Sequence, residues 1–223
     1  MDGLAAASDG TVYLGLRAGR EVWLAVSQDD ARTFAPPFMA FEIGETIPAD
    51  FPNAGFRAFT TVELAVDTSG GPHDGRLYAV WSDYGAQHAD VLTRWSDDAG
   101  RTWSEPVRIN ADRTAADQWM ARVVVAPDGL VHVVYFDRAR DPDNRLIDAV
   151  HAVSRDAGGT WRTMRLTQHQ FDGDLGIHQN GVPFIGDYLG IGASHDAVWV
   201  GFPTTVTGVA EVAVAKVVRA QTR

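Results

Sequence analysis

Four residues with charged or ionisable side chains stand where strand-like runs of the sequence begin. Glu63 and Arg122 occupy the same position in two successive units of the sequence, and Asp187 and Tyr188 open a later unit. If the units are sheets around a common axis, Glu63 and Arg122 would meet across the central channel. Such a pair could belong to a polar binding site, or it could be an ion pair that only lines a wet channel. Asp187 and Tyr188 are candidates by location, and Tyr188 could equally be a packing residue with a hydrogen-bonded hydroxyl.

The elements that would position these residues are β-strands. Short runs rich in Val, Trp, Tyr and Thr recur along the chain, turn signals such as Pro127-Asp128-Gly129 separate them, and helical periodicity is almost absent. When the first hairpins of the units are aligned, Gly3, Glu63, Arg122 and Leu189 share one position, with spacings of 60, 59 and 67 residues. A period of that size predicts an array of like sheets, and a propeller is the array that fits. We expect one all-β domain with four blade units, at about 3–61, 62–118, 119–187 and 188–223.

A recurring octet follows the third strand of three units. It reads Ser-x-Asp-x-Gly-x-Thr-Trp at 96–103 and at 154–161, and a weaker copy at 27–34 has Ala and Phe at the Gly and Trp positions. Ser and Asp oxygens can accept hydrogen bonds from nearby backbone N–H groups, Gly tolerates a positive φ, and the aromatic ring can pack back between sheets. The sequence therefore predicts a tight turn at each octet. The residues expected to build these turns are Ser27, Asp29, Ser96, Asp98, Gly100, Trp103, Ser154, Asp156, Gly158 and Trp161.

The octets resemble the Asp-box, or bacterial neuraminidase repeat, of the sialidase superfamily, and the resemblance covers most of the chain. It implies a β-propeller of four-stranded antiparallel blades, with the Asp-boxes on the rim away from the active-site face. Sialidase-like propellers have six blades, so four units could be part of a longer propeller, could close by pairing with another chain, or could form a compact four-bladed ring. We favour the first. Open terminal blades would expose apolar faces and promote self-association.

Three further strings resemble bacterial repeat proteins named exo-alpha-sialidases. They are Asp117-Gln118-Trp119, the run 135–145 and the run 184–190. The resemblance implies a protein that acts on or binds an acidic glycan, in its enzymatic form an exo-alpha-sialidase-like glycoside hydrolase. The alternative is a non-catalytic propeller that binds a glycan or a protein.

Sialidase chemistry requires a cluster of three arginines for the substrate carboxylate, a tyrosine nucleophile activated by a glutamate, and an aspartate for acid–base catalysis. By location alone, Arg122, Tyr188, Glu63 and Asp187 match these roles. The family places Phe-Arg-Ile-Pro before its first Asp-box. The nearest string here is Phe56-Arg57-Ala58-Phe59, which follows the first octet, so the role is not assigned to Arg57.

The loop between 137 and 148 concentrates oxygen ligands. Hard cations such as Ca²⁺ take six to eight oxygens, so this loop could hold one, although its spacing is not that of an EF-hand. The candidate ligands are Asp137, Asp141, Asp143 and Asn144, with Asp148 at the end of the loop. The alternative is a solvated loop whose carboxylates are neutralised by Arg138, Arg140 and Arg145. The expected function requires no cofactor.

Composition excludes several classes of partner. The chain has 223 residues, a formal net charge of −10 and no cysteine. An acidic surface argues against nucleic acid and anionic membranes, and the missing thiols exclude disulfides and thiolate metal sites. No apolar run has the length of a membrane helix, and the first seven residues lack the basic region of a secretory signal. We expect an extracellular or periplasmic protein.

Overall fold

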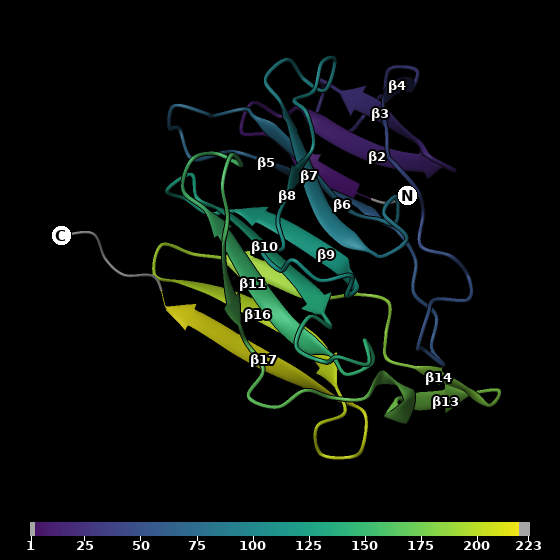
Figure 1. Ribbon diagram of the computed structural model, residues 1–223. Helices are drawn as coiled ribbons and strands as arrows, with labels where there is room; N and C mark the ends of the chain where they lie inside the picture. Colours follow the sequence, from purple (N-terminus) through teal and green to yellow (C-terminus); the bar gives the residue numbers. More distant parts are fainter. Residues whose placement is uncertain (1–2, 219–223) are drawn as a thin grey trace.

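The computed structural model describes residues 3–218, which fold as a series of antiparallel β-sheets (Figure 1). Sheet 1 comprises β1 (Gly3–Ala6), β2 (Val12–Ala18), β3 (Glu21–Ser27) and β4 (Phe38–Glu42). Sheet 2 comprises β5 (Val62–Val66), β6 (Leu77–Asp83), β7 (Asp90–Ser96) and β8 (Val107–Arg108). Sheet 3 comprises β9 (Gln118–Val125), β10 (Val131–Asp137), β11 (Asp148–Ser154) and β12 (Arg162–Arg165). Sheet 4 comprises β15 (Gly190–Ala193), β16 (Ala197–Thr204) and β17 (Glu211–Val218).

The predicted fold class is confirmed, with one smaller sheet and one additional hairpin. Sheets 1 to 3 have four strands in sequential order, whereas sheet 4 has three. A short 3₁₀ turn, η1 (Gly173–Leu175), and a separate hairpin of β13 (Ile177–Gln179) and β14 (Val182–Phe184) precede sheet 4. The first strands of neighbouring sheets contact one another in series, β1 with β5, β5 with β9 and β9 with β15. Figure 1 shows the sheets following one another from sheet 1 at the top to sheet 4 at the bottom.

Three apolar layers, one between each pair of neighbouring sheets, form the core. Strand residues alternate between the two faces of a sheet, so each sheet has a forward face, toward the next sheet along the chain, and a backward face. Sheets 2 and 3 are covered on both faces, and every residue of β6 is buried. Val133 and Tyr135 pack backward against sheet 2, while Val134 and Phe136 point forward into the apolar layer shared with sheet 4. Among the described residues, no helix has the length and hydropathy needed to cross a membrane.

The octets form the expected turns. Asp98 accepts hydrogen bonds from the Thr102 backbone N–H at 2.8 Å, the Thr102 hydroxyl at 2.6 Å and the Ser96 hydroxyl at 2.8 Å. These bonds, the Thr102 hydroxyl foremost, lower the pKa of Asp98 to about 2. Gly100 has a φ of +83°, and a Cβ there would lie 2.4 Å from Leu24 Cδ1 of the preceding sheet. Each turn therefore closes on itself, and the turns of sheets 2 and 3 also pack over the sheet before them.

The connection from β4 to β5 leaves its own sheets and packs against sheet 3. Its Phe51 and Phe56 contact Trp119, with ring centroids 5.3 and 6.2 Å apart. The fully buried guanidinium of Arg138 lies 4.8 Å from the Trp119 ring, and its Nη1 donates to the Pro52 carbonyl at 2.9 Å. Asp117 provides the opposite charge, 3.6 Å from Nη1. Arg138 thus joins the connection to the start of sheet 3.

We predict that Arg138→Met lowers the free energy of unfolding by about 3–5 kcal/mol, because Asp117 would remain buried without its countercharge. The matched control is Arg145→Met. Arg145 is half-exposed and pairs with Asp172 and Asp174, so its loss should cost less than about 1 kcal/mol. Urea denaturation of both variants measures the difference, and equal losses would contradict a special role for the buried cation.

Sheet 3 contains a buried histidine pair. His132 Nδ1 and His151 Nε2 lie 2.9 Å apart, so one ring donates a proton to the other, and both side chains are buried. Burial lowers the pKa of each histidine to about 4. The equivalent positions of sheet 2 hold Tyr78 and Thr93, which do not titrate in this range.

We predict that stability falls as the pH drops from about 6.5 to about 4. The unfolded chain takes up protons on both histidines below their ordinary pKa of 6.5, whereas the folded chain does so only near pH 4. Linkage then costs the fold roughly 2–3 kcal/mol per histidine at the acid end of this window. A double variant, His132→Tyr with His151→Thr, copies sheet 2 and should lose much less stability over the same window. Thermal melts at half-unit pH steps test this, and parallel profiles would refute it.

Candidate functional site

The structure brings Glu63 and Arg122 together at the first strands of sheets 2 and 3. Their side chains form an ion pair, and both are mostly buried. Arg122 Nε also donates to the Leu189 carbonyl at 3.2 Å, and the guanidinium carbon lies 5.1 Å from the centre of the Tyr188 ring. Burial lowers the pKa of Arg122. Three of the four predicted residues therefore contact one another in series from β5 through β9 to the start of sheet 4.

Asp187 is fixed beside this group by an arginine from a distant part of the chain. Arg57 Nε donates to Asp187 Oδ1 at 3.1 Å, and its Nη2 forms the second bond to the same carboxylate. The guanidinium carbon of Arg57 also lies 5.4 Å from the centre of the Phe184 ring. Tyr188, in contrast, is 70% exposed. The site therefore combines the exposed ring of Tyr188, the guanidinium of Arg122 against that ring, and the fixed carboxylate of Asp187 beside it.

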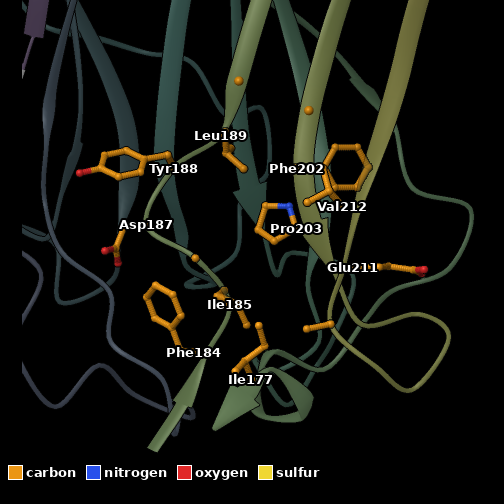
Figure 2. Close-up of a pocket in the computed structure, with 14 residues that line it drawn as sticks. Ile177, Phe184, Ile185, Asp187, Tyr188, Leu189, Phe202, Pro203, Glu211 and Val212 are labelled. Atoms are coloured by element: carbon orange, nitrogen blue, oxygen red, sulfur yellow. The ribbon is translucent and has the colours of Figure 1, made fainter. Parts of the chain in front are cut away.

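A hollow of about 680 Å³ borders Tyr188 and Asp187. Most of its wall is apolar, from Phe184, Ile185, Leu189, Phe202, Pro203 and Val212 among others. Figure 2 shows Tyr188 and Asp187 on one side of the hollow and Phe202 with Val212 on the other. Glu211 points away from the hollow and accepts a hydrogen bond from the Thr207 hydroxyl at 3.1 Å. The arrangement can hold a ligand with one apolar face and a few hydroxyl or charged groups.

The four candidate metal ligands do not converge. Both oxygens of Asp141 accept backbone N–H groups, including that of Leu146 at 2.6 Å. Asn144 exchanges two hydrogen bonds with Asp117, and Asp137 accepts from the Ala139 backbone N–H at 2.6 Å. Within residues 3–218, no group of three or more His, Asp or Glu side chains is arranged to hold a metal ion. The loop is instead held by hydrogen bonds within itself and to Asp117.

Sequence reasoning missed the contribution of Arg57 and Phe184. The string Phe56-Arg57-Ala58-Phe59 is visible in the sequence, but Arg57 and Asp187 are 130 residues apart. Their pairing depends on the path of the 43–61 connection across the end of sheet 3, for which the sequence carries no local signal.

Comparison with known proteins supports the fold. No family model matches the chain, and no curated protein matches it. A family GH43_12 protein from a capybara gut metagenome is similar in structure, with a TM-score of 0.57 and 10% identity over 99% of this chain and 41% of that one. The endo-arabinase of Bacteroides thetaiotaomicron has a TM-score of 0.55 and 13% identity over 95% of this chain and 71% of that one.

The intramolecular trans-sialidase from Ruminococcus gnavus is 17% identical over 88% of this chain and 40% of that one, with a TM-score of 0.46. The chain covers 41% of the GH43_12 protein and 40% of the trans-sialidase, which is less than half of the length of each. At such identities the likeness concerns the fold alone, and that fold is a β-propeller.

We predict that Ca²⁺ leaves the melting temperature unchanged, because the oxygens of Asp141 already accept backbone N–H groups within the loop and the Asn144 oxygen accepts the Asp117 backbone N–H. A ligand that binds only the folded state would raise the melting temperature in proportion to its occupancy. Differential scanning fluorimetry with Ca²⁺, with Mg²⁺ at equal ionic strength, and with EDTA provides the measurement. A rise with Ca²⁺ alone that EDTA reverses would reinstate a calcium site at this loop.

Proposed function

We propose that this propeller binds a carbohydrate at the face formed by Tyr188. The observation that carries the proposal is the exposed Tyr188 ring, supported from behind by Arg122 and flanked by the Asp187 carboxylate. The apolar face of a sugar ring can stack on an aromatic side chain, and a carboxylate accepts hydrogen bonds from sugar hydroxyls. Two of the structural neighbours are a GH43_12 protein and an endo-arabinase, which agrees with a carbohydrate ligand.

The catalytic form of this proposal is a glycoside hydrolase of the exo-alpha-sialidase type. The octet turns have the hydrogen bonds expected of Asp-boxes, which supports a place in the sialidase superfamily. In this form Tyr188 would be the nucleophile, Glu63 would accept its proton, Arg122 would bind the acidic sugar and Asp187 would act in acid–base catalysis. An extracellular or periplasmic location fits such a substrate.

The second candidate is a non-catalytic scaffold that binds a glycan or a protein. The ion pairs of the site favour this candidate, because Arg122 is already paired with Glu63 and Arg57 with Asp187. A sugar carboxylate would have to compete with these partners for both guanidinium groups. Arg122 contacts Tyr188 and Arg57 binds Asp187, so these contacts bring two arginines to the site, whereas sialidase chemistry requires a cluster of three.

The test of binding compares Tyr188→Ala with the wild type by calorimetry, using arabino-oligosaccharides and sialyllactose as probes. We expect affinity to fall about tenfold or more, since a stacked ring contributes on the order of 1.4 kcal/mol. Phe34→Ala is the control, because Phe34 is an exposed ring on an octet turn of sheet 1. Absence of binding to every probe, or equal loss in both variants, would overturn the proposal.

Hydrolysis of a fluorogenic sialoside separates the two forms. If the enzymatic form is correct, Tyr188→Phe and Glu63→Gln should each reduce kcat by more than about a hundredfold while sialyllactose still binds. Glycan binding without hydrolysis by the wild type would instead support the scaffold.

A further inference from the structure

A second hollow, of about 650 Å³, lies between sheets 1 and 2 at the edge where the octet turns lie. The octet turn of sheet 1 and the segment after it form one side, and Ala99 and Arg101 of the octet turn of sheet 2 form the other. Val26 of β3 and Phe38 of β4 line it from the forward face of sheet 1. Among the described residues, this rim hollow shares no lining residue with the hollow beside Tyr188.

The corresponding place between sheets 2 and 3 is filled by three side chains. The ring of Trp95 lies against the octet turn of sheet 3, because a Cβ on Gly158 would be 3.1 Å from it. The guanidinium carbon of Arg76 lies 5.5 Å from the centre of the Trp95 ring. Arg76 donates to both oxygens of Asp97, at 2.7 and 2.8 Å, and to the Ala157 carbonyl at 3.2 Å. An indole, a cation on its face and a carboxylate thus close the edge of this interface.

The same three positions of sheet 1 hold smaller or uncharged side chains. The strand registers place Val26, Thr11 and Gln28 where sheet 2 has Trp95, Arg76 and Asp97. An isopropyl group in place of an indole, and a hydroxyl in place of a guanidinium, leave most of the groove unfilled. The rim hollow is therefore the place where an aromatic ring that closes the next interface is missing.

We propose that the rim hollow binds a small aromatic carboxylate. Its flat ring would occupy the place that the indole of Trp95 fills in the next interface, and its carboxylate would pair with Arg101. Arg101 is exposed, and the octet of sheet 3 has Gly159 at this position, so the cation belongs to the unfilled interface and not to the filled one. A guanidinium matches a carboxylate through two parallel hydrogen bonds. The volume of the rim hollow is typical of a small-molecule site.

The charges around the rim hollow favour an anion over a cation. Asp29 also borders it, but this carboxylate already accepts hydrogen bonds from the Thr33 backbone N–H at 2.8 Å, the Thr33 hydroxyl at 2.6 Å and the Ser27 hydroxyl at 2.7 Å. These bonds, the Thr33 hydroxyl foremost, lower the pKa of Asp29 to about 2. Because the turn itself engages the carboxylate of Asp29, the exposed guanidinium of Arg101 is the group that a charged ligand would meet.

The experiment titrates indole-3-acetate into the protein in a calorimeter. The wild type should bind it one-to-one, more tightly than hexanoate, which has no ring, and more tightly than tryptamine, whose charge is reversed. Val26→Trp copies sheet 2, fills the rim hollow and should abolish binding. Arg101→Gln should weaken binding about fivefold, the upper range for an exposed ion pair. Arg32→Gln is the control, because Arg32 has the same octet position in sheet 1 but does not line the rim hollow, and it should bind as the wild type does.

Several outcomes would overturn the proposal. One is a wild type that does not bind indole-3-acetate at millimolar concentration. Unchanged affinity in Val26→Trp would place the ligand elsewhere, and equal affinity in Arg101→Gln and Arg32→Gln, or tryptamine binding as tightly as indole-3-acetate, would refute the role of the cation. Circular dichroism verifies that each variant is folded. The exposed position of Arg101 lets its variant decide the question even if Val26→Trp does not fold.

Discussion

The buried guanidinium of Arg138 is the interaction on which the arrangement of the loops depends. A cation without access to water is tolerated only where opposite charge and hydrogen-bond acceptors replace the solvent. Here Asp117 supplies the opposite charge, and the carbonyls of Pro52 and Asn53 accept hydrogen bonds from the guanidinium. The rings of Phe51, Phe56 and Trp119 surround the guanidinium. Four of these partners, the two carbonyls and the rings of Phe51 and Phe56, belong to the 43–61 connection. If that connection moved away from sheet 3, the guanidinium of Arg138 would lose its carbonyl acceptors while still buried. The connection therefore keeps one path although it has no regular secondary structure.

The fixed path has consequences at the candidate site. A few residues after the Arg138 contacts, the Gly55 backbone N–H donates to Asp174 at 2.7 Å and Arg57 binds Asp187. Two long connections, 43–61 and 166–189, are thereby joined to each other, although they lead into different sheets. Tyr188 lies at the end of the second connection, and Arg122 of β9 lies behind its ring. The site thus combines one rigid strand position with a loop that is held through a chain of contacts beginning at Arg138.

The sequence was informative where structure is local and uninformative where it depends on distant segments. The octets predicted the turns because their hydrogen bonds span only two to four residues, and the repeat spacing correctly aligned Glu63 with Arg122. The Asn180-Gly181 signal between two short runs could have revealed the β13–β14 hairpin. In contrast, Arg138 was interpreted as a partner of the carboxylates in its own loop. Two of its three aromatic neighbours, Phe51 and Phe56, and both of its carbonyl acceptors are more than 80 positions away, so they could not be read from the local pattern.

The candidate site is continuous with the forward face of sheet 4. Gly190, Gly201 and Val212 line the hollow next to Tyr188, and they belong to the same forward face as Trp199. Glycine at two of these places leaves the backbone of β15 and β16 open to close approach by another segment. A sheet packed on this face would therefore form a further wall of the hollow and narrow its opening.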